Sequence, residues 1–140
     1  MPEIIKYHPS HIFAIETMFS FDDVSRRTMS GHDVASGYTL CENETIIACG
    51  GVHKMWKGNG EAWLLMSVHA YKMPVTVARY THKLFETIMA DNDLWRIQAS
   101  VHTTDEQSIK FAEWMGFENE GLMKKFGPDG ADYYRFARVV

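Results

Sequence analysis

The sequence contains only two cysteines, Cys41 and Cys49, among its 140 residues. They lie in segments whose residue pattern predicts neighbouring strands, so the two side chains could face each other. Nothing else in the sequence suggests an oxidising compartment, where disulfides form and persist. We therefore expect both cysteines to be reduced residues of a sheet.

Long apolar runs and an excess of basic residues are also absent. No stretch approaches the roughly 20 apolar residues that a membrane span requires, and the opening residues MPEIIKYHPSH lack the apolar core of a signal peptide. The net charge is −4, which disfavours a dedicated duplex nucleic-acid binder, because such proteins carry a basic face. We expect a cytoplasmic protein without a membrane or nucleic-acid partner.

Metal-binding spacing is missing as well. The seven histidines form no compact group with cysteines or carboxylates, so no metal site is expected. What the chain does have is apolar material, since 46% of its residues are hydrophobic and 13% are aromatic. A chain of this length and composition fits one folded domain covering residues 1–140.

Hydrophobic periodicity predicts the element order β, α, α, β, β, β, α, β, α, β, β. Capping-box spacing starts one helix at Ser20 and another at Thr104. The run 61–68 is apolar at nearly every position, which indicates a strand buried on both faces. The order predicts a mixed sheet with helices on its faces. The expected strands are 3–7, 37–42, 45–56, 61–68, 94–101, 121–126 and 131–140, and the expected helices lie within 10–30 and at 74–90 and 104–117.

The segment SVHAYKMPVTVARYTHKLF, residues 67–85, joins the central strand to the central helix. Pro74 suits the first helical position, where the missing amide hydrogen has no intrahelical partner. A strand that leads into the exposed amides of a helix N-terminus is a common place to bind a phosphate. Such loops are normally rich in glycine, and this one contains none.

The element order and two motifs resemble the GNAT acyltransferase superfamily over essentially the whole chain. The helix 103–117 ends in Gly116-Phe117, as GNAT helices often do, and GEAWLLMSV resembles the strand on which some members place a general-base glutamate, here Glu61. The resemblance implies an α+β fold with a mixed, mostly antiparallel sheet of six to seven strands. Helices would cover both faces, and a central β-α-β unit would bind the cofactor.

The same resemblance implies an N-acetyltransferase that moves an acetyl group from acetyl-CoA to an amine by direct attack in a ternary complex. Glu61 would take the proton of the amine, and a main-chain amide at Ser67 or Val68 would polarise the thioester carbonyl. Helix and loop amides and basic side chains would hold the cofactor. The implied cofactor-binding residues are Val68, Lys72, Ala78, Arg79, Tyr80 and Asp105.

The sequence departs from the family pattern in both halves of the expected cofactor site. The glycine positions of the Arg/Gln-x-x-Gly-x-Gly/Ala motif fall on Val77, Arg79 and Thr81. The side chains of Val77 and Arg79 should narrow the approach of the phosphates, although Lys72, Arg79 and Lys83 could supply charge-assisted contacts. In the later helix, Asp105 and Ala112 replace the asparagine and the tyrosine that members often carry. Without that tyrosine, either another acid protonates the departing thiolate, with Tyr133 and Tyr134 as candidates, or the chemistry is weakened.

Glycine-poor versions of this fold also resemble proteins of T7-like bacteriophages. The alternative function is therefore a degenerate GNAT-fold protein that acts as a binding or virion-associated protein, in the host cytoplasm or the virion. The sequence leaves open whether the amine acceptor is a small molecule or a protein, and whether the chain forms a homodimer.

Overall fold

A computed structural model describes residues 2–8, 10–15 and 37–140. It contains a seven-stranded sheet with the order β1-β2-β3-β4-β5-β7-β6, in which β4 and β5 are the parallel pair and the other neighbours are antiparallel. The strands are β1 (Glu3–Lys6), β2 (Gly37–Glu42), β3 (Thr45–Trp56), β4 (Asn59–Met66), β5 (Arg96–His102), β6 (Glu118–Met123) and β7 (Tyr133–Val139). The helices are α1 (His11–Ala14), α3 (Pro74–Asp91) and α4 (Glu106–Trp114), with a 3₁₀ turn at Ala70–Lys72.

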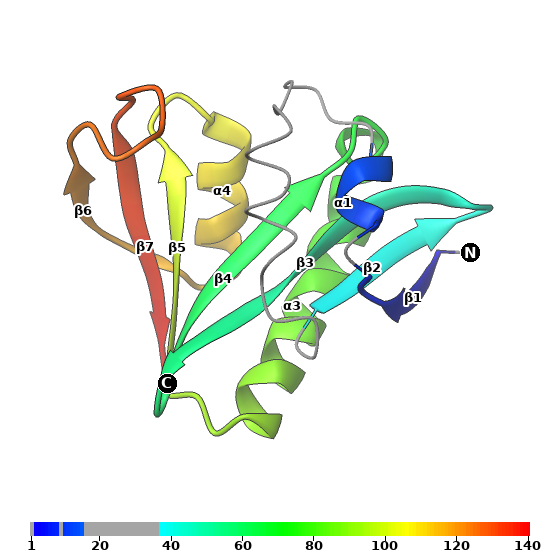
Figure 1. Cartoon of the computed structure of the whole chain (residues 1–140), viewed down its shortest axis with the longest axis horizontal. Helices are drawn as coiled ribbons and strands as arrows, with labels where there is room; N and C mark the ends of the chain where they lie inside the picture. Colours follow the sequence, from blue (N-terminus) through cyan, green and yellow to red (C-terminus); the bar gives the residue numbers. More distant parts are fainter. Residues whose placement is uncertain (1, 9, 16–36) are drawn as a thin grey trace.

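Helices lie on both faces of the sheet, as Figure 1 shows for α1 and α3. The alternation of side chains along β4 decides which residues meet which helix. Ala62 and Leu64 pack toward α3 and α4, whereas Trp63 and Leu65 pack with Tyr7 on the α1 face. The expected mixed α+β fold is confirmed, and β4 is buried or half-buried along its length.

The β2–β3 hairpin agrees with the sequence prediction at both strands. Asn43 and Glu44 form its two-residue turn with φ angles of 49° and 67°, the left-handed values that match the twist of paired strands. Cys41 and Cys49 lie in these two strands, and both are buried and take part in no disulfide among the described residues. The expectation of reduced sheet cysteines therefore agrees with the structure.

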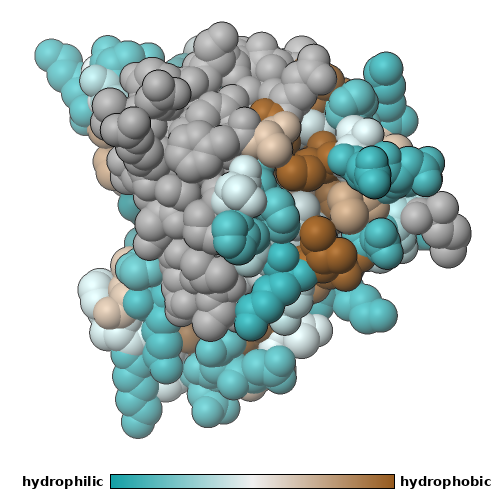
Figure 2. Space-filling model, turned by 45° about the vertical axis from the view of Figure 1, so that its right-hand side comes forward, coloured by the Kyte–Doolittle hydropathy of each residue, from teal (hydrophilic) through white to brown (hydrophobic). Residues whose placement is uncertain are grey.

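Strand β1 forms one edge of the sheet and is largely exposed. Figure 2 turns that side of the molecule forward; most of the residues that it colours are hydrophilic, and apolar ones gather beside the grey region. The side chain of Ile5 in β1 is 40% exposed. Isolated exposure of this kind is normal for a protein surface.

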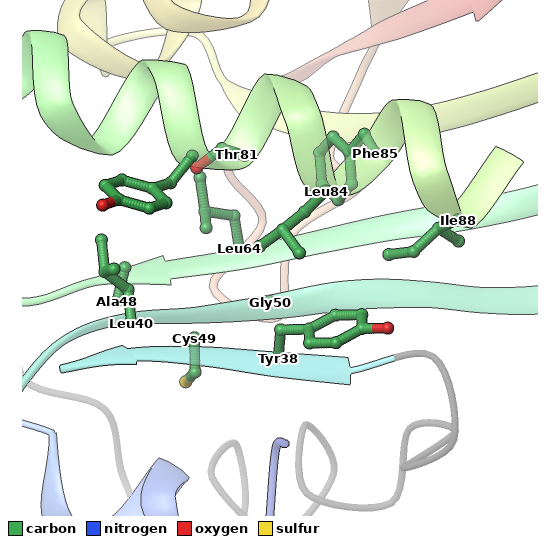
Figure 3. A pocket seen from close by; sticks show the side chains of 11 residues that line it. Tyr38, Leu40, Ala48, Cys49, Gly50, Leu64, Thr81, Leu84, Phe85 and Ile88 are labelled. Atoms are coloured by element: carbon green, nitrogen blue, oxygen red, sulfur yellow. The ribbon is translucent and has the colours of Figure 1, made fainter. Parts of the chain in front are cut away.

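Helix α3 begins at Pro74, as expected, and buries one side against the sheet. Val77, Phe85 and Ile88 are among its buried residues. A cavity of about 20 Å³ remains between this helix and β2, β3 and β4 (Figure 3). It is lined mainly by apolar groups and has room for about one water molecule, so it is a packing defect and no ligand site.

Several predicted boundaries differ from the structure. Helix α4 is capped by Asp105, not Thr104, because the Asp105 carboxylate accepts hydrogen bonds from the Ser108 amide at 3.1 Å and from its hydroxyl at 2.6 Å. Strand β6 ends at Met123, because Lys125 turns the chain with a φ of 54° and its amide donates to Asp132. Strand β4 ends at Met66, two residues before the predicted end. The helix predicted to start at Ser20 lies outside the described residues.

Candidate active site

Strands β4 and β5 pair only at one end. Glu61 with Gln98 is the last pair of their parallel ladder. Beyond it the strands diverge (Figure 1), and a cleft of about 840 Å³ occupies the gap. Residues of β4, β5, α4 and the loop between β6 and β7 line this cleft. Main-chain groups on the facing edges of the two strands cannot pair with each other there, so water or a ligand must satisfy them.

Glu61 lies at the closed end of the cleft, on the α1 face of the sheet. Its carboxylate accepts a hydrogen bond from Gln98 Nε2 at 2.9 Å. The guanidinium of Arg135, from β7, lies 3.2 Å and 3.3 Å from its two oxygens. The expected base is therefore at the cleft, but it is held in an ion pair by a residue that sequence reasoning missed.

Ser67 follows β4 directly and is completely buried. Its amide donates to the Ile47 carbonyl at 2.8 Å, and its hydroxyl accepts from the His69 amide at 3.1 Å. The Ser67 amide is thus engaged in the sheet and cannot also polarise a thioester. Among the described residues, none accepts a hydrogen bond from the Val68 amide, which leaves Val68 as the better candidate for that role.

The N-terminus of α3 offers two main-chain donors. Pro74 has no amide hydrogen, and Val77 is the first residue of the helix whose amide bonds back, to the Met73 carbonyl at 3.1 Å. No side chain caps this end, so the amides of Val75 and Thr76 have no partner within the helix. The helix dipole and these two donors favour an anion at this end.

The N-terminus of α4 lies at the other wall of the cleft. Asp105 lines the cleft while it caps the helix. Burial, and then the charge of Asp105, raises the pKa of Tyr71, which lies in the 3₁₀ turn after β4. Tyr71 therefore lies near Asp105, although no sequence motif indicated it.

Tyr133 and Tyr134, the two candidate acids, lie on opposite faces of β7. Tyr133 lines the cleft, and its ring centroid is 5.1 Å from that of His102. Burial, and then the charge of Asp129, raises the pKa of Tyr133. Tyr134 packs against the core beneath α3 and α4 instead. Position therefore favours Tyr133 as the acid.

His102 also lines the cleft, and one of its ring nitrogens is engaged. Nδ1 accepts a hydrogen bond from the Thr104 amide at 3.2 Å. In the neutral ring Nε2 then carries the proton. His102 is thus arranged to donate a hydrogen bond rather than to take a proton.

Comparison with known proteins gives the family. A model of the acetyltransferase (GNAT) domain matches residues 15–135. The chain belongs to the GNAT acetyltransferase family. Among curated proteins, no sequence matches it significantly.

Solved structures agree with the GNAT fold. Ard1 from Thermoplasma volcanium has a TM-score of 0.78 at 13% identity, over 99% of this chain and 97% of that one. A putative phosphinothricin N-acetyltransferase has a TM-score of 0.77 at 16% identity, over 100% and 99%. The ribosomal-protein-S18-alanine N-acetyltransferase from Escherichia coli has a TM-score of 0.76 at 14% identity, over 100% and 94%. At these identities the likeness shows the fold alone. The narrower resemblance to bacteriophage proteins stays a prediction.

The positions that replace the GNAT loop glycines lie inside helix α3, not in the loop. Val77 is 1% exposed and Thr81 is 7% exposed, so both side chains lie on the buried side of the helix. The expectation that a bulky side chain narrows the phosphate approach is therefore wrong for Val77, whose side chain is buried beneath the helix. Arg79 is exposed and can contribute charge.

The remaining cofactor candidates of this GNAT domain divide by exposure. Lys72 is exposed just before the first turn of α3 and can reach an anion there. Ala78 is buried, and Tyr80 packs partly against the core cluster under the helix. The Ala78 amide lies within the regular part of α3, so Lys72 and Arg79 are the stronger candidates.

The part of the chain that the structure describes supports neither a metal site nor a membrane-spanning helix. Residues 2–8, 10–15 and 37–140 hold no group of three or more histidine, cysteine, aspartate or glutamate residues placed to bind a metal ion. Over those same ranges, no helix combines the length and apolar character needed to cross a bilayer.

Proposed function

We propose that this GNAT protein is an N-acetyltransferase that transfers an acetyl group from acetyl-CoA to an amine. The observation that carries the proposal is the open cleft between β4 and β5, which begins at the Glu61–Gln98 pair and has a volume of about 840 Å³. Small-molecule sites typically measure about 300–1,000 Å³. Side chains do not fill the gap, so a long, narrow substrate can enter between the strands.

Acetyl-CoA fits this cleft through the groups that surround it. The pyrophosphate would bind at the N-terminus of α3, to the amides of Val75 and Thr76 and to the charges of Lys72 and Arg79. The amide groups of the pantetheine arm would pair with the free edge of β4. The Val68 amide would then donate to the thioester carbonyl.

The reaction proceeds by direct attack in a ternary complex. Glu61 takes a proton from the acceptor ammonium, and the free amine attacks the thioester carbonyl carbon. The new carbon–nitrogen bond forms as the carbon–sulfur bond breaks. Tyr133 donates its proton to the departing thiolate and recovers one from the nitrogen of the product amide. The products are the acetylated amine, CoA and one proton released from Glu61.

The neighbours' names leave the acceptor open. They name phosphinothricin in one case and the alanine of a ribosomal protein in another, which are a small molecule and a protein. At 14–16% identity, neither protein's acceptor can be assigned to this chain. The acceptor must therefore be inferred from the residues of the cleft itself.

One observation favours the alternative function of a binding or virion-associated protein. Because α3 starts with Pro74 and residues 67–85 contain no glycine, the expected anion site has two free helix amides and no glycine loop. Such a site would bind phosphates less tightly than a glycine-rich loop, whose backbone can approach more closely. Loss of acetyl-CoA binding is the outcome that this alternative predicts.

Ligand-dependent melting separates the two functions. A ligand that binds only the native state adds about 2.7 kcal/mol at one hundred times its Kd, so millimolar acetyl-CoA should raise the melting temperature by several degrees at micromolar affinity. Arg79→Ala should reduce the shift, while Lys54→Ala, at an exposed position on β3, should not. No shift, and no CoA retained through mild purification by mass spectrometry, would rule out the transferase.

A further inference from the structure

The Glu61–Arg135 ion pair lies where an acceptor must approach the cleft. The two residues are 74 positions apart and meet because β5 places β4 and β7 on either side of it. Their side chains are 28% and 21% exposed, respectively. The pair is thus partly shielded from water, and removing either partner would leave a charge that is poorly solvated.

Arg135 retains capacity for a second anion. A guanidinium has five N–H donors and forms two parallel bonds with a carboxylate when geometry allows. Here Nη1 faces Glu61, whereas Nη2 reaches only the sulfur of Met123, at 3.5 Å. Thioether sulfur is a weak acceptor, so the Nη2 side of Arg135 lacks a strong partner in this arrangement.

The ring of Phe126 is a second packing partner for the Arg135 guanidinium. Its Cζ lies 5.9 Å from the centroid of the Phe126 ring, and Phe126 lines the cleft. A guanidinium over an aromatic face is stabilised by the ring. Arg135 can therefore turn from Glu61 toward the cleft and keep a packing partner throughout.

The charge balance decides which amine suits this arrangement. An amine without a carboxylate that binds Glu61 must displace Arg135 and leave its guanidinium without a directly bound carboxylate, because Glu120, whose charge also acts on Arg135, is paired with Arg96. An acceptor that carries an ammonium and a nearby carboxylate satisfies both residues, because the ammonium meets Glu61 while the carboxylate replaces Glu61 on Arg135. Exchange of one ion pair for two leaves no charge unpaired.

We propose, on the basis of the acetyltransferase function above, that the acceptor is a free amino acid or a similar zwitterionic amine. Arg135 binds its carboxylate and determines specificity, and Glu61 becomes available as the base only when such an acceptor releases it from Arg135. Trp63, Phe126 and Tyr133 line the cleft and favour an apolar or aromatic side chain. A peptide N-terminus is disfavoured, because its first carboxyl group is an uncharged amide.

Release of CoA thiol from acetyl-CoA tests the proposal with matched acceptors. Phenylalanine, leucine, tryptophan and methionine are each compared with the corresponding decarboxylated amine and with the corresponding amino-acid amide. At least one amino acid should exceed both analogues by about tenfold or more in kcat/KM, because a site built for a polar group strongly rejects an analogue that lacks it. Amines or amides that react as well as every amino acid, or no reaction of any amino acid, would overturn the proposal.

Variants at two arginines of β7 give the control. Arg135→Gln should abolish the preference for the carboxylate, and Arg135→Lys should retain part of it through charge alone. Arg138→Gln should leave the preference intact, because Arg138 lies on the opposite face of the strand and binds Glu86 of α3. If Arg135→Gln does not fold, Arg135→Lys still tests the role of Arg135. That role is contradicted if the preference for amino acids over their analogues is unchanged both in Arg135→Lys and in the wild type at high salt.

Melting with acetyl-CoA distinguishes the two levels of failure. If acetyl-CoA stabilises the protein and only amines without a carboxylate are acetylated, the transferase function stands and the zwitterionic acceptor is wrong. If acetyl-CoA produces neither a melting shift nor any thiol release, the transferase function itself is wrong, and the acceptor proposal falls with it.

Discussion

The ring of His11, in α1, is joined to the hydroxyl of Thr39, in β2, by a hydrogen bond of 2.7 Å at Nδ1. The same nitrogen accepts the amide hydrogen of His8 at 3.1 Å. Nδ1 therefore acts as an acceptor and carries no proton. The bond attaches the first helix to the sheet in the neutral state of the ring.

Acidification should weaken this attachment. Burial, and then the neighbouring charge of His8, lowers the pKa of His11 below its ordinary value of 6.5. The unfolded chain then binds more protons than the folded one as the pH falls through 6.5. The contribution of His11 to the free energy of unfolding is therefore present above that pH and is lost below it. Chemical denaturation at pH 7.5 and pH 5.5 should show a smaller pH dependence in His11→Gln than in the wild type. His53→Gln, on the exposed side of β3, should keep the wild-type dependence, and an equal reduction there would contradict the role of His11.

Replacement of the base should separate binding from turnover. Glu61→Gln keeps the side-chain shape but cannot take a proton, so kcat should fall by about 10²–10⁴-fold while the melting shift with acetyl-CoA persists. Glu86→Gln breaks an ion pair away from Glu61, that with Arg138, and should leave kcat near the wild-type value. A wild-type kcat in Glu61→Gln would remove this carboxylate from the mechanism.

Two adjacent tyrosines provide a matched test of the general acid. Tyr133→Phe removes the hydroxyl that lines the cleft and should lower kcat by about 10²-fold or more. Because burial and Asp129 raise the pKa of Tyr133, its hydroxyl stays protonated at neutral pH and can serve as a donor. Tyr134→Phe alters the opposite face of the same strand and should leave kcat unchanged. Equal kcat in the two variants would exclude Tyr133 as the acid, and Tyr71 would be the next candidate.

The sequence predicted the elements whose signals are local. Alternation along residues 37–42 and 45–56 and the proline at 74 are properties of a few neighbouring residues, and the structure has those strands and that helix start. The position of Val77 and Thr81 also followed from this information, because a helix that begins at Pro74 must contain both.

The ion pair of the site could not be predicted in this way. The resemblance to GNAT proteins predicts Glu61 at the site, but Arg135 lies on β7, and the two meet only because of the strand order β4-β5-β7. No local spacing carries that information. Gln98 donates a hydrogen bond to Glu61. It could not be predicted at the site for the same reason, because its local sequence shows only an alternating strand.

The turn between β3 and β4 provides a test of the scaffold that holds this site. Gly58 and Gly130 both have a φ of +80°, so alanine at either position is strained by about 1–2 kcal/mol. At Gly58 a Cβ atom would also overlap the ring of Trp95, 2.0 Å from Cε2. At Gly130 it would meet no atom of the described residues within 4 Å.

Gly58→Ala should therefore destabilise the protein by about 1–3 kcal/mol more than Gly130→Ala, the usual cost of overpacking. Urea denaturation of the two variants measures that difference directly. The Gly58 carbonyl also accepts the amides of Trp95 and Arg96, at 2.9 Å and 3.0 Å, at the closed end of the β4–β5 pair. A displaced turn should then disturb the Glu61–Gln98 register and lower kcat, whereas Gly130→Ala should change kcat less. Equal destabilisation by the two substitutions would show that Trp95 moves aside without cost and that the turn does not fix the closed end of the cleft.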